Sequence, residues 1–166
     1  MVDRVAKILE GSPLVVTDSA APRTAPCIGC TTPSRAVHRR TLEHLVKPVK
    51  AATIQDVQYY YCSNSHCEVV YFSNENVPVF TVEDVKVRVF AKDLGENVAV
   101  CYCFDWTRAR IKNELIQTGH STAPANIARE IEAGNCACDV RNPKGECCLG
   151  DVRSFIASMA NAQRTA

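Results

Sequence analysis

Two short runs of aromatic and β-branched residues dominate the apolar pattern in the first half of the chain. They cover Val57–Tyr61 and Glu68–Phe72, and a polar segment separates them. Residues of these types favour strands, and a short polar connection between two such runs favours a hairpin. Val85–Phe90 alternates apolar with basic residues, which predicts a half-exposed strand. Residues 27–97 are therefore predicted to form a β-rich subdomain.

After Cys103 the apolar positions follow a helical period. Asp105 is a predicted N-cap for a helix over Trp106–Gln117, and Gly119 is its predicted end. Asp side chains accept hydrogen bonds from the first free N–H groups of a helix, and glycine tolerates the left-handed backbone that often ends one. The change of period marks the boundary of a second, helical subdomain.

Two further helices are predicted towards the C-terminus. Pro124 opens the first, with Ile127 and Ile131 on one face, and Gly134 closes it. The second begins after Gly150, because its apolar residues recur at i, i+3, i+4 and i+7. These residues are Val152, Phe155, Ile156 and Met159.

The predicted fold class is α+β, with a small β-rich subdomain over residues 27–97 and a helical subdomain over residues 98–166. Ser19–Pro26 is rich in small residues and proline, which is typical of a linker. Residues 1–26 are therefore predicted to be a flexible N-terminal extension.

Composition narrows the class of protein. Hydrophobic residues make up 46% and charged residues 22% of the chain, as in ordinary soluble domains. A formal net charge of +1 gives no electrostatic reason to expect nucleic-acid binding. No apolar run approaches the roughly 20 residues that span a bilayer, and the N-terminus lacks the continuous apolar centre of a secretion signal. A cytoplasmic protein without membrane insertion is expected.

Ten cysteines in 166 residues are the strongest chemical signal. Reduced thiols in close pairs suit tetrahedral sulfur coordination of zinc or iron, so two metal centres are predicted. A disulfide framework is the rival explanation, but it is typical of short secreted chains. The cysteines fall into four close groups: Cys27 with Cys30, Cys62 with Cys67, Cys101 with Cys103, and Cys136, Cys138, Cys147 and Cys148.

The first two pairs predict a zinc site. Cys27-x2-Cys30 has the spacing of a zinc knuckle, and Cys62-x4-Cys67 bounds the loop of the predicted hairpin. Four thiolates fill a tetrahedron, so this metal is expected to be structural. His66 is an alternative ligand that the cysteine count disfavours, and a redox role for the first pair lacks the expected βαβ context.

The remaining cysteines predict an iron–sulfur centre. Cys101-x-Cys103 is tighter than a usual zinc knuckle, and a two-iron two-sulfur cluster needs four thiolates. Six thiols compete for these positions, and the neighbours Cys147 and Cys148 are not expected to bind one cluster together. Spare thiols are expected to be buried, to bind a transferred metal or to report redox state. A second zinc site is the alternative.

With these motifs in hand, the chain resembles the N-terminal domain of CopZ-type copper chaperones, a group that carries zinc and a two-iron two-sulfur cluster. The resemblance rests on Tyr60–Phe72, Val100–Phe104 and Cys138–Gly150, together with the N-terminal cysteine pair. The C-terminal half is also similar to bacterioferritin-associated ferredoxins, because a C-x-C pair precedes distant cysteines. Copper-delivering members add a domain with a Met-x-Cys-x-x-Cys loop, which these residues lack, so direct delivery is not expected.

The resemblance implies specific ligands. It places the cluster near the turn Asn142–Gly145, which is expected to fold Cys138 towards Cys148. Cys136 is left as an extra thiol. The implied zinc ligands are Cys27, Cys30, Cys62 and Cys67, and the implied cluster ligands are Cys101, Cys103, Cys138 and Cys148.

The expected function is that of a metallochaperone component, which handles copper or another thiophilic metal through one-electron transfer by the cluster. A metal-transport or copper-handling protein, such as a copper ATPase, is the expected partner. The alternatives are a ferredoxin-like electron carrier for iron mobilisation and a structural zinc adaptor. No catalytic constellation is present, so an enzyme is not expected. Four basic residues near the second set, Arg108, Arg110, Arg141 and Lys144, are expected on a solvated surface, with a docking face as the alternative.

Overall fold

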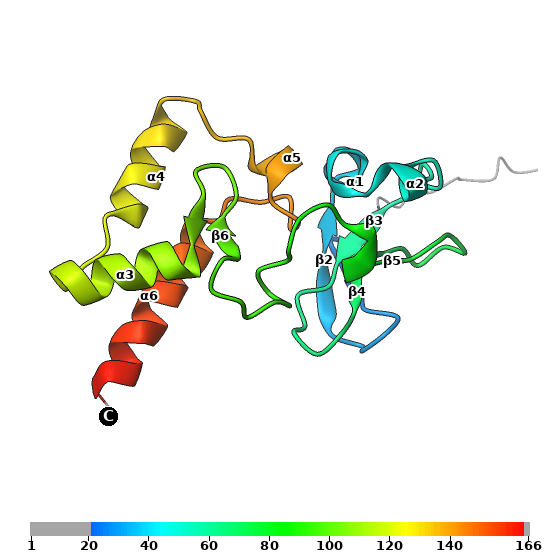
Figure 1. Ribbon diagram of the computed structural model, residues 1–166. Coiled ribbons are helices and arrows are strands. Elements are labelled where there is room, and N and C mark those ends of the chain that lie inside the picture. The colour runs from blue at the N-terminus through cyan, green and yellow to red at the C-terminus, as the bar shows by residue number, and fades with distance from the viewer. Residues whose placement is uncertain (1–20, 165–166) are drawn as a thin grey trace, which may run out of the picture.

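The computed structural model describes residues 21–164, which form two lobes (Figure 1). The sheet lobe comprises residues 21–86 and the helical lobe residues 98–164, with residues 87–97 between them. The α+β fold class is thus confirmed. Most of the predicted N-terminal extension, residues 1–20, lies outside the described residues. Among the residues that are described, no helix has the length and apolar character to span a membrane.

The sheet lobe is built on a five-stranded sheet in which all neighbouring strands are antiparallel. The predicted hairpin is present, because Tyr60 pairs with Phe72 and Tyr61 with Tyr71. The first strand falls within the predicted extension, whose last residues therefore belong to the sheet. In sheet order the strands are β1 (Thr24–Pro26), β2 (Pro33–Val37), β3 (Tyr59–Tyr61), β4 (Val69–Phe72) and β5 (Phe80–Thr81).

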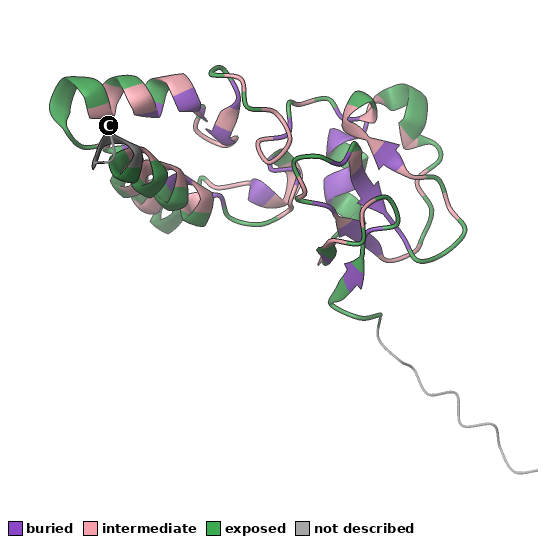
Figure 2. Cartoon of the chain, turned by 90° about the horizontal axis from the view of Figure 1, so that it is seen from below, coloured by how far each residue is buried: buried purple, intermediate pink, exposed green. Residues whose placement is uncertain are grey.

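Alternation along β3 gives the sheet two different buried faces. Tyr59 packs into an apolar core that also contains Leu42 of helix α1 (Arg39–Leu45). Tyr60 points the opposite way, and its ring stacks on Phe72 with centroids 5.5 Å apart. Both of these rings belong to a second cluster, which contains cysteine side chains. Figure 2 shows the resulting run of buried residues through the strands. The short helix α2 (Pro48–Ala51) follows α1.

The predicted strand over Val85–Phe90 is wrong. Only Val85 makes a β-bridge, with Val46, after the short 3₁₀ helix η1 (Val82–Asp84). The chain then turns at Val89, whose carbonyl accepts hydrogen bonds from two N–H groups further on. The N–H group of Phe90 donates to the Tyr102 hydroxyl at 2.8 Å. The Phe90 N–H group therefore has its hydrogen-bond acceptor in the helical lobe and not in a neighbouring strand, although the alternation of apolar residues would fit a strand.

The helical lobe packs its helices around Val100, Ile111, Ile127 and Val152, all of which are buried. Helices of the predicted type are present in all three predicted places. The elements are the two-stranded sheet β6 (Ala99–Cys101) and β7 (Trp106–Thr107), then α3 (Arg108–Thr118), α4 (Ala123–Glu132), α5 (Cys138–Arg141) and α6 (Leu149–Arg164).

One local prediction in this lobe, the N-cap of α3, needs correction. Thr107, and not Asp105, caps α3, because its hydroxyl accepts the N–H of Arg110 at 3.2 Å. Asp105 instead has a φ of 52° and lies in the tight turn between β6 and β7. Ile127 and Ile131 lie four residues apart on one face of α4, as predicted, and of the two only Ile127 is buried, at 1% exposure against 36% for Ile131. The predicted end of α3 at Gly119 is confirmed, with a left-handed φ of 76°.

Residues 138–148 of the helical lobe, here called the connecting loop, make hydrogen bonds to the sheet lobe. The Thr41 hydroxyl of α1 donates to the Asp139 carbonyl at 2.6 Å. The Tyr71 hydroxyl of β4 donates to the Pro143 carbonyl at 2.8 Å in a buried contact. Gly145 has a φ of 69°, and a Cβ atom there would lie 3.0 Å from Thr41 Oγ1. The loop is thus seated against the sheet lobe.

Candidate metal centres

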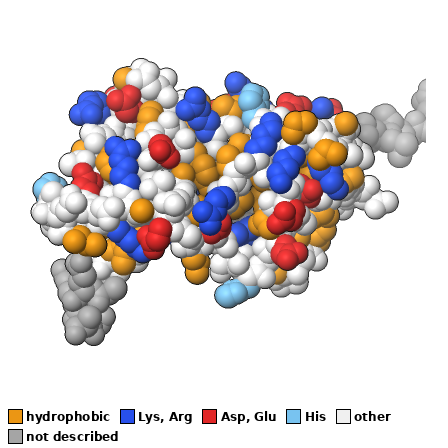
Figure 3. Space-filling model, viewed as in Figure 1, with side chains coloured by type: hydrophobic (Ala, Val, Ile, Leu, Met, Phe, Trp, Pro, Cys, Tyr) orange, Lys and Arg blue, Asp and Glu red, His pale blue; other side chains and the backbone are white. Residues whose placement is uncertain are grey.

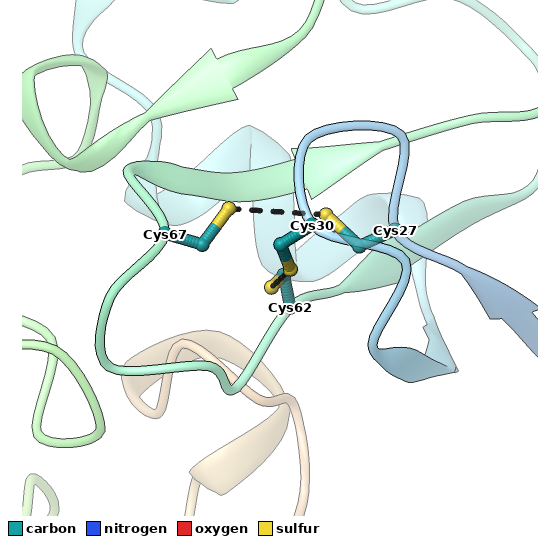
Figure 4. Close-up of side chains that lie close together, drawn as sticks. All are labelled: Cys27, Cys30, Cys62 and Cys67. Atoms are coloured by element: carbon teal, nitrogen blue, oxygen red, sulfur yellow. Dashed lines mark hydrogen bonds between the residues drawn. The ribbon is translucent and has the colours of Figure 1, made fainter.

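Four thiols of the sheet lobe converge on one point (Figure 4). The Sγ atoms of Cys27, Cys30, Cys62 and Cys67 all lie within 4.8 Å of one another. Cys30 and Cys62 are 3.6 Å apart, and Cys27 and Cys67 are 4.0 Å apart. A tetrahedron with metal–sulfur bonds of about 2.3 Å has sulfur atoms about 3.8 Å apart. The spacing of this first thiol group therefore fits a single tetrahedral ion.

Local backbone geometry brings the two pairs together. Cys27 and Cys30 lie in the turn between β1 and β2, and the other pair bounds the β3–β4 loop. A Cβ atom on Gly29 would lie 3.0 Å from the Val69 side chain and 3.3 Å from Cys67 Sγ. Glycine is thus needed at this position for close approach of the two turns. In the turn between β1 and β2, the residue with a left-handed backbone conformation is Thr31, whose φ is 61°.

Backbone N–H groups point at the sulfurs. Hydrogen bonds from the Thr32 hydroxyl and N–H lower the pKa of Cys30 to about 6. Burial raises the pKa of Cys27 to about 12, even though the Gly29 N–H group favours the thiolate. Neighbouring thiolates repel one another, so the metal-free group holds protons that a cation displaces.

His66 stays outside the first thiol group, as expected. Its side chain is exposed, and only its backbone N–H is fixed, by Asn64 at 2.9 Å. The loop is held instead by Lys92, whose ammonium group donates to the carbonyls of Asn64 and Cys67 at 2.8 Å each. This support comes from the segment between the lobes, and nothing in the local spacing indicated it.

A second set of thiols gathers in the helical lobe. The Sγ atoms of Cys103, Cys136 and Cys138, here called the outer trio, lie within 4.8 Å of one another. The Cys103–Cys138 distance is 3.6 Å, and the Cys136–Cys138 distance is 3.2 Å. The outer trio contains two of the four cysteines implied as cluster ligands. Its third member is the cysteine that sequence reasoning left as an extra thiol.

Cys101 and Cys148, here called the inner pair, lie deeper, at 0% and 1% exposure. Hydrogen bonding to Cys148 lowers the pKa of Cys101 and brings that of Cys138 to about 5. The inner pair belongs to the same buried cluster of the helical lobe as Cys138, and Cys103 and Cys136 pack against that cluster. Cys147 is exposed and lies outside both sets. All ten cysteines are within the described residues, and none forms a disulfide.

The buried guanidinium of Arg108 is a residue that sequence reasoning misplaced, because a solvated surface was expected. The side chain donates to the carbonyls of Phe90 at 2.7 Å and Asp93 at 2.6 Å. It also lies 4.2 Å from the Phe90 ring centroid. Arg108 thus fastens the segment between the lobes to the helical lobe. Its burial depends on distant packing, which leaves no local signal.

Two exposed arginines support the loop that carries Cys103. Arg141 donates to the Cys103 carbonyl at 3.3 Å, and Arg110 donates to the Asp105 carbonyl at 3.2 Å. Arg110 also lies 3.7 Å above the Trp106 ring. Elsewhere on the face seen in Figure 3, Lys and Arg side chains are interspersed with Asp and Glu.

Comparison with known proteins gives a consistent relationship. The CopZ family model described as "Zinc binding domain" matches residues 24–86, which include the whole first thiol group. The copper chaperone CopZ of Archaeoglobus fulgidus is 34% identical over 92 residues, or 54% of this chain and 42% of that protein. The X-ray structure of its N-terminal domain is 31% identical and has a TM-score of 0.65. That match covers 78% of this chain and 95% of the solved chain. The chain therefore belongs to the family of the CopZ N-terminal zinc-binding domain.

Proposed function

We propose that this chain is a redox-active metallochaperone component, with a structural zinc ion in the sheet lobe and a two-iron two-sulfur cluster in the helical lobe. The observation that carries the proposal is the separation of the thiols into two groups of different construction. The alignment over 95% of the CopZ N-terminal domain supports it. The matched segment spans only 42% of the curated chaperone, so the activity of that whole protein is not carried over.

The first thiol group suits zinc held in a closed site. Its ligands are Cys27, Cys30, Cys62 and Cys67, whose mutual distances fit a tetrahedron. Four protein sulfurs leave no position for a substrate, so the ion stabilises the fold without reacting. It links the β1–β2 turn to the β3–β4 loop, and its binding energy contributes to folding.

The second set suits a cluster ligated by Cys101, Cys103, Cys138 and Cys148. When bound, such a cluster exchanges single electrons. The inner pair is shielded from water, whereas Cys103 is only partly buried. The Ala137 N–H donates to Cys103 Sγ at 3.4 Å, and such donors stabilise sulfur in its anionic form. Electron exchange is proposed at the Cys103 side, where the protein cover is thinnest.

Copper is the proposed cargo. Thiolates prefer the soft ion Cu(I), so reduction of Cu(II) by one electron prepares copper for thiolate carriers. The protein is proposed to act in the cytoplasm, and the proposed partner is a metal-transport or copper-handling protein, such as a copper ATPase. In this proposal, the present chain reduces the copper and the partner protein delivers it.

Elemental analysis and spectroscopy of anaerobically purified protein test this proposal. We expect one zinc, two irons and two acid-labile sulfides per chain, with the visible absorption of a two-iron cluster. Reduced protein is then mixed with Cu(II) and a Cu(I)-specific chelator, and one Cu(I) per reduced cluster is expected. Colourless protein with two zinc ions would support a structural adaptor instead. A cluster that takes up electrons but never reduces copper would support an electron carrier for iron mobilisation.

A further inference from the structure

Five thiols surround the second centre, although a two-iron cluster takes four. The inner pair and Cys138 are buried, whereas Cys103 and Cys136 are partly exposed. The centre thus has a deep side and an outer side. The surplus thiol lies on the outer side.

The backbone places Cys136 where it competes with Cys138. The two residues flank Ala137, whose N–H group donates to Cys103 Sγ at 3.4 Å. Both side chains therefore approach Cys103 from one short segment. Cys136 Sγ lies 3.2 Å from Cys138 Sγ, and all three sulfurs lie within 4.8 Å of one another. A metal ion bound to Cys103 and Cys138 is consequently within a small side-chain rotation of Cys136.

We propose that Cys136 is an exchange ligand, which would take the place of Cys138 on the iron that Cys138 binds. The inference rests on the proposed function, because it assumes that a cluster binds at this centre. In the exchange, the Cys136 thiol gives up its proton and forms a sulfur–iron bond, while the Cys138 sulfur leaves the iron and takes a proton. The charge of the centre and its electron count do not change.

Exchange at the outer side opens the centre without exposing the inner pair. Cys136 is accessible to an incoming thiophilic metal or to a thiol of a partner, whereas Cys101 and Cys148 are not. Loading and release of iron are therefore proposed to proceed through the outer trio. Cys147 has no such role, because it is exposed and does not belong to the trio.

Alanine variants of the outer thiols test the exchange, since alanine leaves no oxygen or sulfur to bind iron. Cys138→Ala and Cys136→Ala are reconstituted anaerobically beside the double variant, and bound iron and sulfide are measured with the absorption spectrum. Each single variant is expected to keep a cluster, and the double variant to lose about 10-fold or more of its bound iron. Cys138→Ala combined with Cys147→Ala is the matched control, which should behave as Cys138→Ala alone. Zinc content and far-UV circular dichroism report whether each variant is folded.

Iron release provides a second test that leaves Cys138 in place. With an iron chelator in excess, Cys136→Ala is expected to lose iron more slowly than wild type, because the exchange route is missing. Equal rates of iron loss in Cys136→Ala and wild type would overturn the exchange alone. So would a Cys138→Ala variant that binds as little iron as the double variant, provided that the wild type binds iron in the same experiment. Wild-type protein without iron would overturn the proposed function as well.

Discussion

The two thiol groups differ in how much of the fold each requires. The first thiol group comes from two tight turns of one sheet, within a segment that the family model covers. The second set comes from β6 and the turn after it, the approach to α5, α5 itself and the residue before α6. Its connecting loop is also held by Thr41 and Tyr71 of the sheet lobe. One centre is local, and the other depends on both lobes.

This difference matches the two proposed roles. A local site with matched thiols and no surplus donor gives a single rigid coordination, which is what a structural ion requires. A site assembled from several segments is adjustable, and here five cysteines share one cluster of the helical lobe. We therefore expect the two centres to respond asymmetrically when either is disturbed.

Removal of zinc is expected to have the largest effect. Structural zinc contributes about 10 kcal/mol or more to folding, which is comparable to the entire stability of a small domain. Chelation should abolish amide-exchange protection in β3 and β4 and release the cluster, because the sheet lobe supports the connecting loop. Removal of iron alone should leave the sheet lobe protected. Intact protection of β3 and β4 in protein shown to be zinc-free would contradict the structural role.

Loss of Arg108 is the next largest expected effect. Arg108→Met is expected to reduce the free energy of unfolding by about 3 kcal/mol, because the partly buried carbonyls of Phe90 and Asp93 lose the charged donor of a buried side chain. Chemical denaturation measures the change. Arg110→Met, at an exposed position, is the control and should cost less than about 1 kcal/mol. Equal losses in the two variants would show that burial of the guanidinium is unimportant.

The affinity for zinc is expected to fall steeply as the pH is lowered. Burial raises the pKa of both Cys27 and Cys67, so in metal-free protein at neutral pH both thiols carry protons that zinc displaces. With at least these two protons displaced, the apparent affinity for zinc weakens by about 100-fold or more for each unit that the pH falls. Below about 6, which is the pKa of Cys30, the dependence should steepen further. Zinc competition titrations from pH 8 to below the pKa of Cys30, about 6, check this, and a constant affinity would contradict it.

Local signals predicted much of the sheet lobe. The aromatic runs gave the β3–β4 hairpin, and cysteine spacing indicated which four thiols the structure brings together. Gly119 marked the end of α3 because a left-handed residue is needed there. In each case the determining interactions lie within a few residues of one another, so the sequence pattern contains them.

Contacts between distant segments account for the failures. Val85–Phe90 has the alternation of a strand, but Tyr102 takes the hydrogen bond that a neighbouring strand would need. Arg108 is of a residue type that is usually found at the surface, but it is held by carbonyls 15 and 18 residues away in the sequence. The family resemblance left Cys136 as an extra thiol, and the path of the chain over Cys103 brings it into the outer trio. None of these contacts is encoded in local spacing.

The smallest expected effect concerns the hydrogen bond that joins the lobes. Tyr71→Phe removes the hydroxyl that donates to the buried Pro143 carbonyl, at an expected cost of about 1–2 kcal/mol. Because the connecting loop carries both Cys138 and Cys148, iron should leave this variant faster, while zinc retention should not change. Parallel chelator assays for both metals measure the asymmetry.

Tyr59→Phe is the matched control for this test. Its hydroxyl accepts a hydrogen bond from the Gln55 N–H at 3.1 Å, a contact that stays within the sheet lobe. The control should lose no more stability than Tyr71→Phe, because Gln55 is exposed and water can take the place of the lost hydroxyl. Its iron should nevertheless be released at the wild-type rate. If both variants released iron equally fast, general loss of stability would explain the effect, and the dependence of the second centre on the lobe contact would be refuted.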